Sequence, residues 1–561
     1  MKRILALVAS LAFCPHADLL TSLSAQTGLA PQRAKGAMVD SATIAGKVCN
    51  AITGEGISRA IVLLRRLGPA AGEARSYTTT ADETGSFRFR GVDPGAYRFR
   101  ASRVGYVPGE FGSQRMLDAG SPLTLDAGSK LEGVLLPLSP HAVLSGRVFD
   151  ERGDPLSYVK VQALTYRYVY GRRQLVGVGA ATTNDLGEYR IFGLPSGRYL
   201  LSAVLPRQTL GEAAEGERDE LDYVPTFYPR GTDPAFATTI QARPGSTLTG
   251  IDFMMARAPA IRLRGRIVSP TGAAMITVRL SAVESAVGTS ITTITDPTGR
   301  FEIGGVSPGA YLISATLHRG EQVWSARQRL VLKSNVDVAL DLAPPVEVTG
   351  SVRIEGDARA DLSGVRIGLE PRDRGDLLAA LPQALLKEDG TFRLANVCPD
   401  EYYLSVSGLP EGHYLKSVQI GSREVSYEAA VVRADTGEKI ALLLNSGAAS
   451  FDGVVVDRQG QVGAGATIVL VPADQAKRGR LVFYRVTKAD TNGRFRMKDI
   501  SPGTYSLYAW QDIEPGAWMD SGFLEQFADS EKRVTVAEKQ QQTVQLKMAI
   551  TPPTAEGRQN Q

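Results

Sequence analysis

The chain has 561 residues, of which 43% are hydrophobic and 22% are charged. This length exceeds what one hydrophobic core supports, and the composition is that of an ordinary folded protein rather than a disordered or fibrous one. The 63 basic and 59 acidic side chains are interleaved and leave a net charge of +4, so the concentrated basic field of a nucleic-acid-binding protein is excluded. We therefore expect several folded domains and no nucleic acid partner.

The N-terminus has the pattern of a secretion signal. A basic start precedes an apolar run from Ile4 to Phe13, and mostly small and polar residues lead to Ala25. The apolar run is about half as long as a membrane-spanning helix needs. We predict a signal peptide over residues 1–25, a secreted or periplasmic location, and no transmembrane segment in the mature chain. Lipid attachment at Cys14 is the alternative, which the bulky residue before it disfavours.

One motif recurs five times: a turn containing Gly, an aromatic residue, an alternating apolar residue, and a Pro-Gly-like turn followed by Tyr. Gly accepts positive φ in the first turn, and the alternation buries one face of a strand. A Gly-x-apolar strand precedes each copy, and a closing apolar strand follows it. The copies span residues 82–97, 185–199, 296–311, 388–402 and 490–505, and the preceding glycines are Gly46, Gly146, Gly265, Gly350 and Gly453.

This repeat predicts an all-β chain of about five tandem seven-stranded β-sandwich modules of Greek-key or prealbumin-like type, with no helical period. We expect the modules to stack end to end as a rod. The expected boundaries are 42–140 for module 1, 141–258 for module 2 with loop insertions, 259–345 for module 3, 346–448 for module 4, 449–549 for module 5, and 550–561 for a disordered tail.

The segment from Leu144 to Val161, followed by the motif at 185–199, resembles the carboxypeptidase regulatory-like domain. This resemblance implies a transthyretin-like sandwich, grouped with carbohydrate-binding-like folds, and tandem arrays of the kind found in exported bacterial proteins. Modules 1, 2 and 5 fit best. Module 4 departs at Asp400, where the turn Gly is expected, and module 3 is short. The resemblance is specific for a fold and does not assign an activity.

The sequence contains one candidate for catalysis. His318 and Glu321 form a His-x-x-Glu pair with His413 downstream, which is how zinc carboxypeptidases hold their metal. However, His413 falls in another module, and the large catalytic domain of such enzymes is absent. A zinc hydrolase is therefore a remote alternative, and we expect no enzyme, no catalytic residue, no metal and no cofactor. Cys49 and Cys398 fall in different modules, so no disulfide is expected within a module.

Aromatic loops in modules 2 and 5 are the strongest binding feature. Flat aromatic faces stack on sugar rings while neighbouring polar groups bind hydroxyls. One interpretation is a carbohydrate or peptidoglycan site, and the other is packing of the same rings under long loops or between modules. The candidate ligand-binding residues are Tyr166, Tyr168, Tyr170, Tyr223 and Tyr228 in module 2, and Trp510 and Trp518 in module 5.

From these observations we predict a non-catalytic exported protein for recognition or scaffolding at the cell envelope. Glycan or peptidoglycan binding through the aromatic loops of modules 2 and 5 is the alternative. The expected partners are carbohydrates or envelope proteins, and the sequence leaves the ligand, the attachment to the envelope and the oligomeric state open.

Overall fold

The structure is a computed structural model that describes residues 41–67, 76–113, 120, 122–205, 221–259, 261–269, 272, 275–283, 290–356, 360–372, 381–427, 430–433 and 437–549. The prediction of an all-β chain of sandwich modules is confirmed, and five clusters of buried hydrophobic residues lie one in each of modules 1 to 5. No described helix is long and apolar enough to cross a membrane. The expected signal peptide and C-terminal tail lie outside the described residues.

Module 1 shows the plan that the other modules repeat. Its first strand, which carries the repeated Gly, pairs antiparallel with the motif strand β4 and parallel with the closing strand β9, and the repeated Tyr lies in the second sheet on β5. Its strands are β1 (Ala42–Asn50), β2 (Ile61–Arg66), β3 (Ser76–Thr80), β4 (Ser86–Val92), β5 (Gly95–Ser102), β6 (Tyr106–Val107), β7 (Gly109–Glu110), β8 (Leu123–Leu125) and β9 (Lys130–Pro140).

Module 2 adds a long hairpin, formed by β11 and β12, whose strands pair along their whole length up to a turn at Tyr170 and Gly171. Its elements are β10 (Ala142–Phe149), β11 (Lys160–Val169), β12 (Arg172–Thr182), β13 (Glu188–Leu194), β14 (Gly197–Val204), β15 (Leu221–Tyr223), β16 (Thr226–Phe227), the 3-10 helix η1 (Pro234–Phe236), β17 (Ile240–Ala242), β18 (Thr247–Leu248), β19 (Phe253–Met254) and β20 (Arg257–Pro259).

Modules 3 and 4 keep the same plan. Module 3 has β21 (Ile261–Val268), β22 (Thr277–Ala282), β23 (Ser290–Ile294), β24 (Arg300–Val306), β25 (Gly309–Arg319), β26 (Gln322–Leu332) and β27 (Val336–Asp341). Module 4 has β28 (Val346–Ile354), β29 (Arg366–Pro371), β30 (Gln383–Leu385), β31 (Thr391–Val397), β32 (Glu401–Ser407), β33 (Tyr414–Ile420), β34 (Arg423–Val425), β35 (Val431–Arg433) and β36 (Ile440–Asn445).

Module 5 carries short helices in two connections between its strands. Its elements are β37 (Ala449–Val456), β38 (Thr467–Pro472), α1 (Gln475–Arg478), η3 (Leu481–Phe483), β39 (Arg485–Lys488), β40 (Arg494–Ile500), β41 (Gly503–Trp510), η4 (Ala517–Met519), α2 (Ser521–Glu525), η5 (Ala528–Ser530), β42 (Lys532–Val536) and β43 (Gln541–Lys547). We call the segment from η4 to η5 the helical insertion.

The repeated Gly of the first strand is explained by close packing. A Cβ atom on Gly46 would lie 2.1 Å from the carbonyl oxygen of Val134 on the parallel closing strand. At Gly350 it would lie 2.2 Å from the carbonyl oxygen of Ile440 and 2.4 Å from Cζ of Phe392, the aromatic residue of the motif. Only glycine therefore lets the closing strand and the motif ring approach the first strand together.

The first turn of the motif is held by a side-chain oxygen. Oδ1 of Asp82 accepts hydrogen bonds from the backbone N–H groups of Thr84 (2.8 Å) and Ser86 (2.9 Å). Hydrogen bonds from Thr84 and Ser86 hold the pKa of Asp82 below its usual value. In module 2 the equivalent residue is Asn184, which accepts from the N–H of Glu188 at 2.8 Å, so this copy of the motif begins one residue earlier than we expected.

The repeated Tyr closes the second turn in all five modules. Its hydroxyl donates to the carbonyl oxygen four residues earlier, an arrangement like the tyrosine corner of other sandwiches. The bonds are Tyr97 to Asp93 (2.7 Å), Tyr199 to Pro195 (2.6 Å), Tyr311 to Ser307 (2.8 Å), Tyr402 to Cys398 (2.9 Å) and Tyr505 to Ser501 (2.9 Å).

We expect Tyr97→Phe to lower the stability of module 1 by about 1 kcal/mol, because it removes this hydrogen bond and leaves the carbonyl oxygen without its donor. Hydrogen exchange of the β5 amides, followed by mass spectrometry, measures the loss. The matched control is Tyr158→Phe, since the Tyr158 side chain is 75% exposed. Equal protection of β5 in the two variants would show that the hydroxyl contributes nothing.

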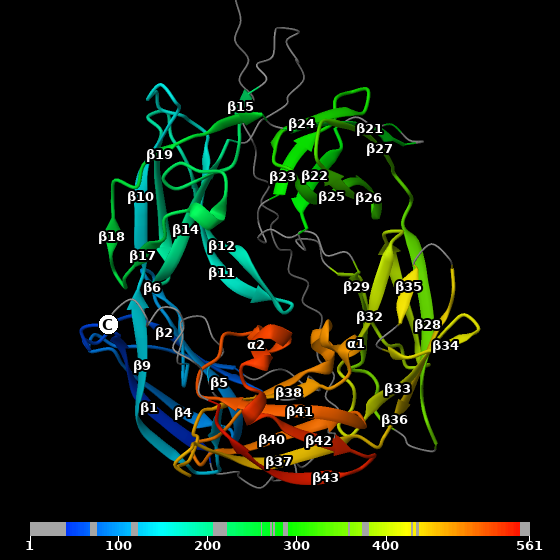
Figure 1. Ribbon diagram of the computed structural model, residues 1–561. Coiled ribbons are helices and arrows are strands. Elements are labelled where there is room, and N and C mark those ends of the chain that lie inside the picture. The colour runs from blue at the N-terminus through cyan, green and yellow to red at the C-terminus, as the bar shows by residue number, and fades with distance from the viewer. Residues whose placement is uncertain are drawn as a thin grey trace, which may run out of the picture.

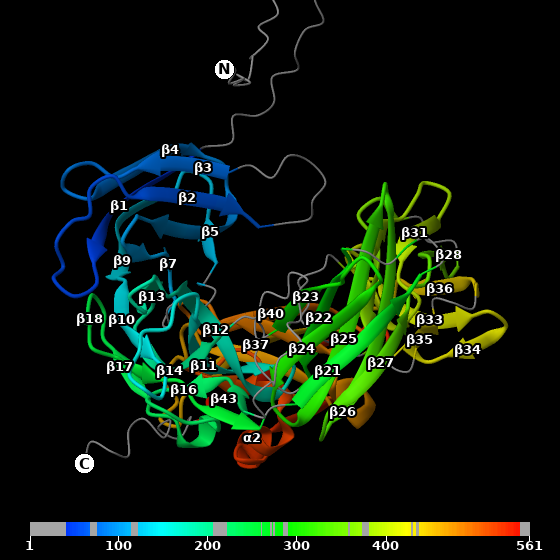
Figure 2. The same ribbon diagram turned by 90° about the horizontal axis from the view of Figure 1, so that it is seen from above.

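The modules do not stack into the expected rod. Figure 1 shows modules 2 to 5 following one another around a ring, with module 5 (orange and red) returning to lie between module 4 and the β11–β12 hairpin of module 2, and Figure 2 shows module 1 (blue) beside module 2. The view from above in Figure 2 also places α2 beside this hairpin. Polar and aromatic side chains join the consecutive modules 3, 4 and 5 and also join module 2 to module 5, as described next.

Candidate recognition site where three modules meet

Module 4 departs from the repeated motif where it contacts module 3. Asp400, which replaces the turn Gly, forms an ion pair with Arg327 on β26. Both side chains are partly buried, with exposed fractions of 25% and 19%. Oδ1 of Asp400 also accepts a hydrogen bond of 2.8 Å from the N–H of Glu401, so the unusual residue in the motif serves both the turn and the junction between two modules.

The junction of modules 4 and 5 also uses a motif residue. Asp499 on β40 has a φ of 57°, in the left-handed region, and its Oδ1 accepts a hydrogen bond of 2.6 Å from the N–H of Gly412. Nearby, the hydroxyl of Tyr414 donates to Oε1 of Glu538 at 2.7 Å. These bonds set the angle between two modules that follow each other directly in the chain.

Arg480 anchors the same junction from the connection after α1. Its side chain is buried, with only 5% of the residue exposed, and it donates to the carbonyl oxygens of Leu404 (2.5 Å) and Tyr427 (2.8 Å) in module 4. Its guanidinium carbon lies 4.9 Å from the ring centre of Tyr403, 5.0 Å from that of Tyr427 and 5.1 Å from that of Phe483. These hydrogen bonds and the contacts with the aromatic faces together offset the free-energy cost of removing this cation from water.

A contact between modules 2 and 5 closes the ring. The backbone N–H of Tyr168, at the end of β11, donates to Oε1 of Glu514 at 3.3 Å, and the Tyr168 ring meets that of Phe523 edge to face at 6.0 Å. At the hairpin turn, a Cβ on Gly171 would lie 2.7 Å from the carbonyl oxygen of Met519. Burial and the neighbouring carboxylates raise the pKa of Tyr168.

The two tryptophans of module 5 belong to the packing behind this contact. Trp510 has no exposed surface and stacks on Tyr508 with ring centres 5.3 Å apart, and Trp518 is 8% exposed in the same cluster. This cluster fills the space between β38, β41 and the helical insertion. Neither ring presents an open face to a sugar, so the structure favours the packing interpretation for both and for the half-buried Tyr168.

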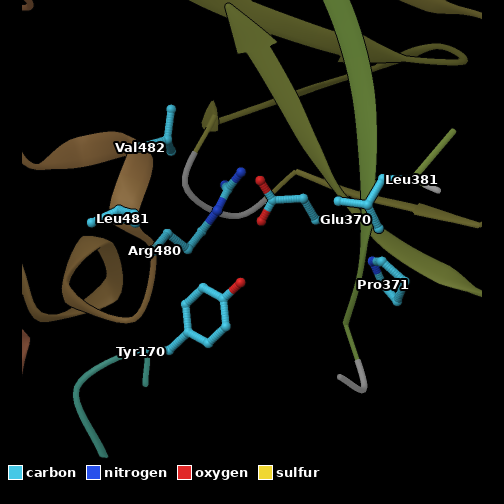
Figure 3. A pocket seen from close by; sticks show the side chains of 7 residues that line it. All are labelled: Tyr170, Glu370, Pro371, Leu381, Arg480, Leu481 and Val482. Carbon is cyan, nitrogen blue, oxygen red and sulfur yellow. The ribbon is translucent and has the colours of Figure 1, made fainter. Parts of the chain in front are cut away.

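A cavity of about 120 Å³ lies where modules 2, 4 and 5 meet. Figure 3 shows the Glu370 carboxylate and the Arg480 guanidinium pointing toward one another, with the Tyr170 ring beside them. Tyr170 is 44% exposed, so its ring is open to solvent at the rim. The cavity is lined by Tyr170 from module 2, by Glu370, Pro371 and Leu381 from module 4, and by Arg480, Leu481 and Val482 from module 5.

The structure does not bring the seven candidate aromatics together. Tyr166, 40% exposed, lies on the same hairpin as Tyr170, with Arg173 4.7 Å from its ring centre. Tyr223 lies instead on β15 with Arg257 5.7 Å from its ring centre, and Tyr228 packs against the core of module 2. Tyr166 and Tyr170 are therefore the two candidates on the hairpin whose side chains are well exposed.

Sequence reasoning missed Glu370 and Arg480. Each is a single charged residue in a different module, and no spacing in the sequence relates them to Tyr170. The only available signal was the extra connection after β38, which the repeat does not require.

The candidate zinc ligands stay apart among the described residues. His318 is exposed at the end of β25 in module 3, whereas His413 is buried beside the junction of modules 4 and 5. No three His, Cys, Asp or Glu side chains in the described part of the chain lie close enough to hold a metal ion. Cys49 and Cys398 are both free thiols.

Comparisons with known proteins agree with the modular architecture. The carboxypeptidase regulatory-like domain model matches residues 43–130 and 262–343, so it fits module 1 as expected and also module 3, for which we expected a poorer fit. A model described as polysaccharide lyase family 4, domain II, matches residues 483–544. The chain is a tandem β-sandwich protein. It contains carboxypeptidase regulatory-like domains in modules 1 and 3.

Among curated proteins, the chain is 26% identical over 277 residues to BOS complex subunit NOMO1 of Homo sapiens. The match covers 44% of this chain and 20% of that protein, so the chain spans about a fifth of this relative. Among solved structures, the Bacillus anthracis TIE protein matches over 73% of this chain and 75% of its own, with 12% identity and a TM-score of 0.16. The major pilin subunit of Bacillus cereus matches over 54% and 99%, with 12% identity and a TM-score of 0.14.

Proposed function

We propose that this protein is a non-catalytic, exported recognition or scaffold protein of the bacterial cell envelope. The observation that carries this proposal is the use of the repeated motif. Its residues build the core of each sandwich or, as at Asp400 and Asp499, join one module to the next. A chain whose repeated residues serve packing and assembly presents loops on a fixed frame, which suits recognition of a partner.

Export is tested by expressing the full chain in a bacterium. We expect recovery from the periplasm or the medium with Gln26 as the new N-terminus, because cleavage is predicted after Ala25. Retention of the uncut chain in the cytoplasm would contradict the proposed location. Cys14 carrying lipid would instead support the alternative of an anchored protein.

Carbohydrate binding is a second candidate function. It is supported by the exposed side chains of Tyr166 and Tyr170, by the charged groups of Arg173, Glu370 and Arg480 nearby, and by the match of module 5 to a domain of a polysaccharide lyase family. An aromatic face with charged hydrogen-bonding groups beside it is the arrangement that sugar rings require.

A glycan and peptidoglycan array, screened with the mature chain, decides between the two candidates. Saturable binding that is lost in Tyr170→Ala and kept in Tyr158→Ala would establish a carbohydrate-binding protein with its site on the hairpin. Both side chains lie in module 2 and are exposed, so they are a matched pair. If the chain binds no glycan, the carbohydrate candidate is abandoned and protein partners become the ligands to seek.

A further inference from the structure

The hairpin turn of module 2 has two roles at once. Gly171 touches the backbone of Met519 in the helical insertion, and its neighbour Tyr170 lines the cavity with Glu370 and Arg480. The same turn therefore both closes the ring and completes the cavity. Without it, modules 4 and 5 would supply only part of the lining.

The closing contact joins two modules that do not follow each other in the chain. Tyr168 and Glu514 are 346 positions apart in the chain, so only the described side-chain and backbone contacts hold the two modules together here. One hydrogen bond of 3.3 Å and one edge-to-face ring pair lie at its centre, around half-buried residues. Contacts of this kind between domains of one chain open readily.

A hairpin of module 3 shows that a turn at a Gly with positive φ need not contact another module. It is formed by β25 and β26 and turns at Gly320, which has a φ of 57°. A Cβ on Gly320 would meet no atom within 4 Å, whereas one on Gly171 would meet the backbone of module 5. Of the two hairpins, only β11–β12 therefore has its turn against another module.

We propose that the contact between the β11–β12 hairpin and the helical insertion is a latch whose closure assembles the three-module cavity. A ligand that touches all three modules binds only the closed ring, so binding and closure favour each other. The ligand class is a saccharide ring, stacked on Tyr170 and bonded through its hydroxyls to the charged groups. The identity of this ligand rests on the carbohydrate function proposed above, but the latch itself does not.

The test compares Gly171→Asn with Gly320→Asn in the mature chain. Both glycines have positive φ, and Asn is among the residues other than Gly that best tolerate it, but only the first substitution collides with module 5. We expect small-angle X-ray scattering to show a radius of gyration several ångströms larger for Gly171→Asn and unchanged for Gly320→Asn. Hydroxyl-radical footprinting should show faster oxidation of Met519, which is 9% exposed in the closed ring.

A second variant distinguishes opening of the ring from misfolding of the hairpin. Phe523→Ala removes the ring that meets Tyr168 and leaves the hairpin sequence intact, and it should open the ring in the same way. If both variants keep their circular dichroism spectra and the radius of gyration of the natural chain, there is no latch. If the ring opens but a glycan identified on the array binds with unchanged affinity, the link between closure and the cavity is wrong. If no glycan on the array binds, the proposed carbohydrate function is rejected. Small-angle X-ray scattering of the two variants still tests whether the contact is a latch.

Discussion

Gly350→Ala is expected to unfold module 4 or to destabilise it by about 3 kcal/mol or more, because overpacking against a backbone atom is relieved only by moving a strand. The added Cβ would lie 2.2 Å from the carbonyl oxygen of Ile440 and 2.4 Å from the ring of Phe392. Both contacts are far inside van der Waals distance. Either the parallel pairing of β28 with β36 or the position of the motif ring must change.

Hydrogen exchange followed by mass spectrometry measures this effect module by module, which suits a chain that does not unfold in one step. We expect faster exchange on β28, β31 and β36 and unchanged exchange in module 1. Gly231→Ala is the control, because a Cβ there would meet no atom within 4 Å. If the amides of β36 exchange as slowly in Gly350→Ala as in the unsubstituted chain, the sandwich adjusts to the added Cβ at little cost in stability. The repeated Gly would then have another role.

Arg480→Ala is expected to separate module 5 from module 4, with a loss of about 2–4 kcal/mol from their junction. The substitution removes the Arg480 donor from the carbonyl oxygens of Leu404 and Tyr427, of which the second keeps only the N–H of Ala430, and it empties the space between three aromatic rings. Arg480→Lys keeps the charge but not the planar group that reaches both carbonyls, so it should recover only part of the loss.

Limited proteolysis near the junction and hydrogen exchange on β32 and η3 report the separation. The exposed Arg458, in a turn of the same module, supplies the control Arg458→Ala. We expect this control to behave as the natural chain does. Equal cleavage of Arg480→Ala and Arg458→Ala would mean that the junction is held by other contacts, such as the bonds of Asp499 and Tyr414 and the ion pair of Lys498 with Glu411.

The repeated residues were enough to predict the sandwich, because each acts over a short distance. Gly46 and its equivalents permit the close approach of the closing strand, and Tyr97 and its equivalents bond a carbonyl four residues away. Alternating apolar residues then set which face of each strand is buried. These requirements act within one module and recur in all five, so they are visible in the sequence.

The arrangement of the modules and the candidate site were decided by the tertiary structure alone. Tyr170, Glu370 and Arg480 meet because the chain curves into a ring, and the curvature depends on single contacts such as Asp400 with Arg327 and Tyr168 with Phe523. Such contacts occur once each and join residues far apart in the chain, so no period or spacing in the sequence predicts them. For the same reason the sequence could not decide between binding and packing for Trp510: its burial is set by the helical insertion that folds over it, not by its own strand.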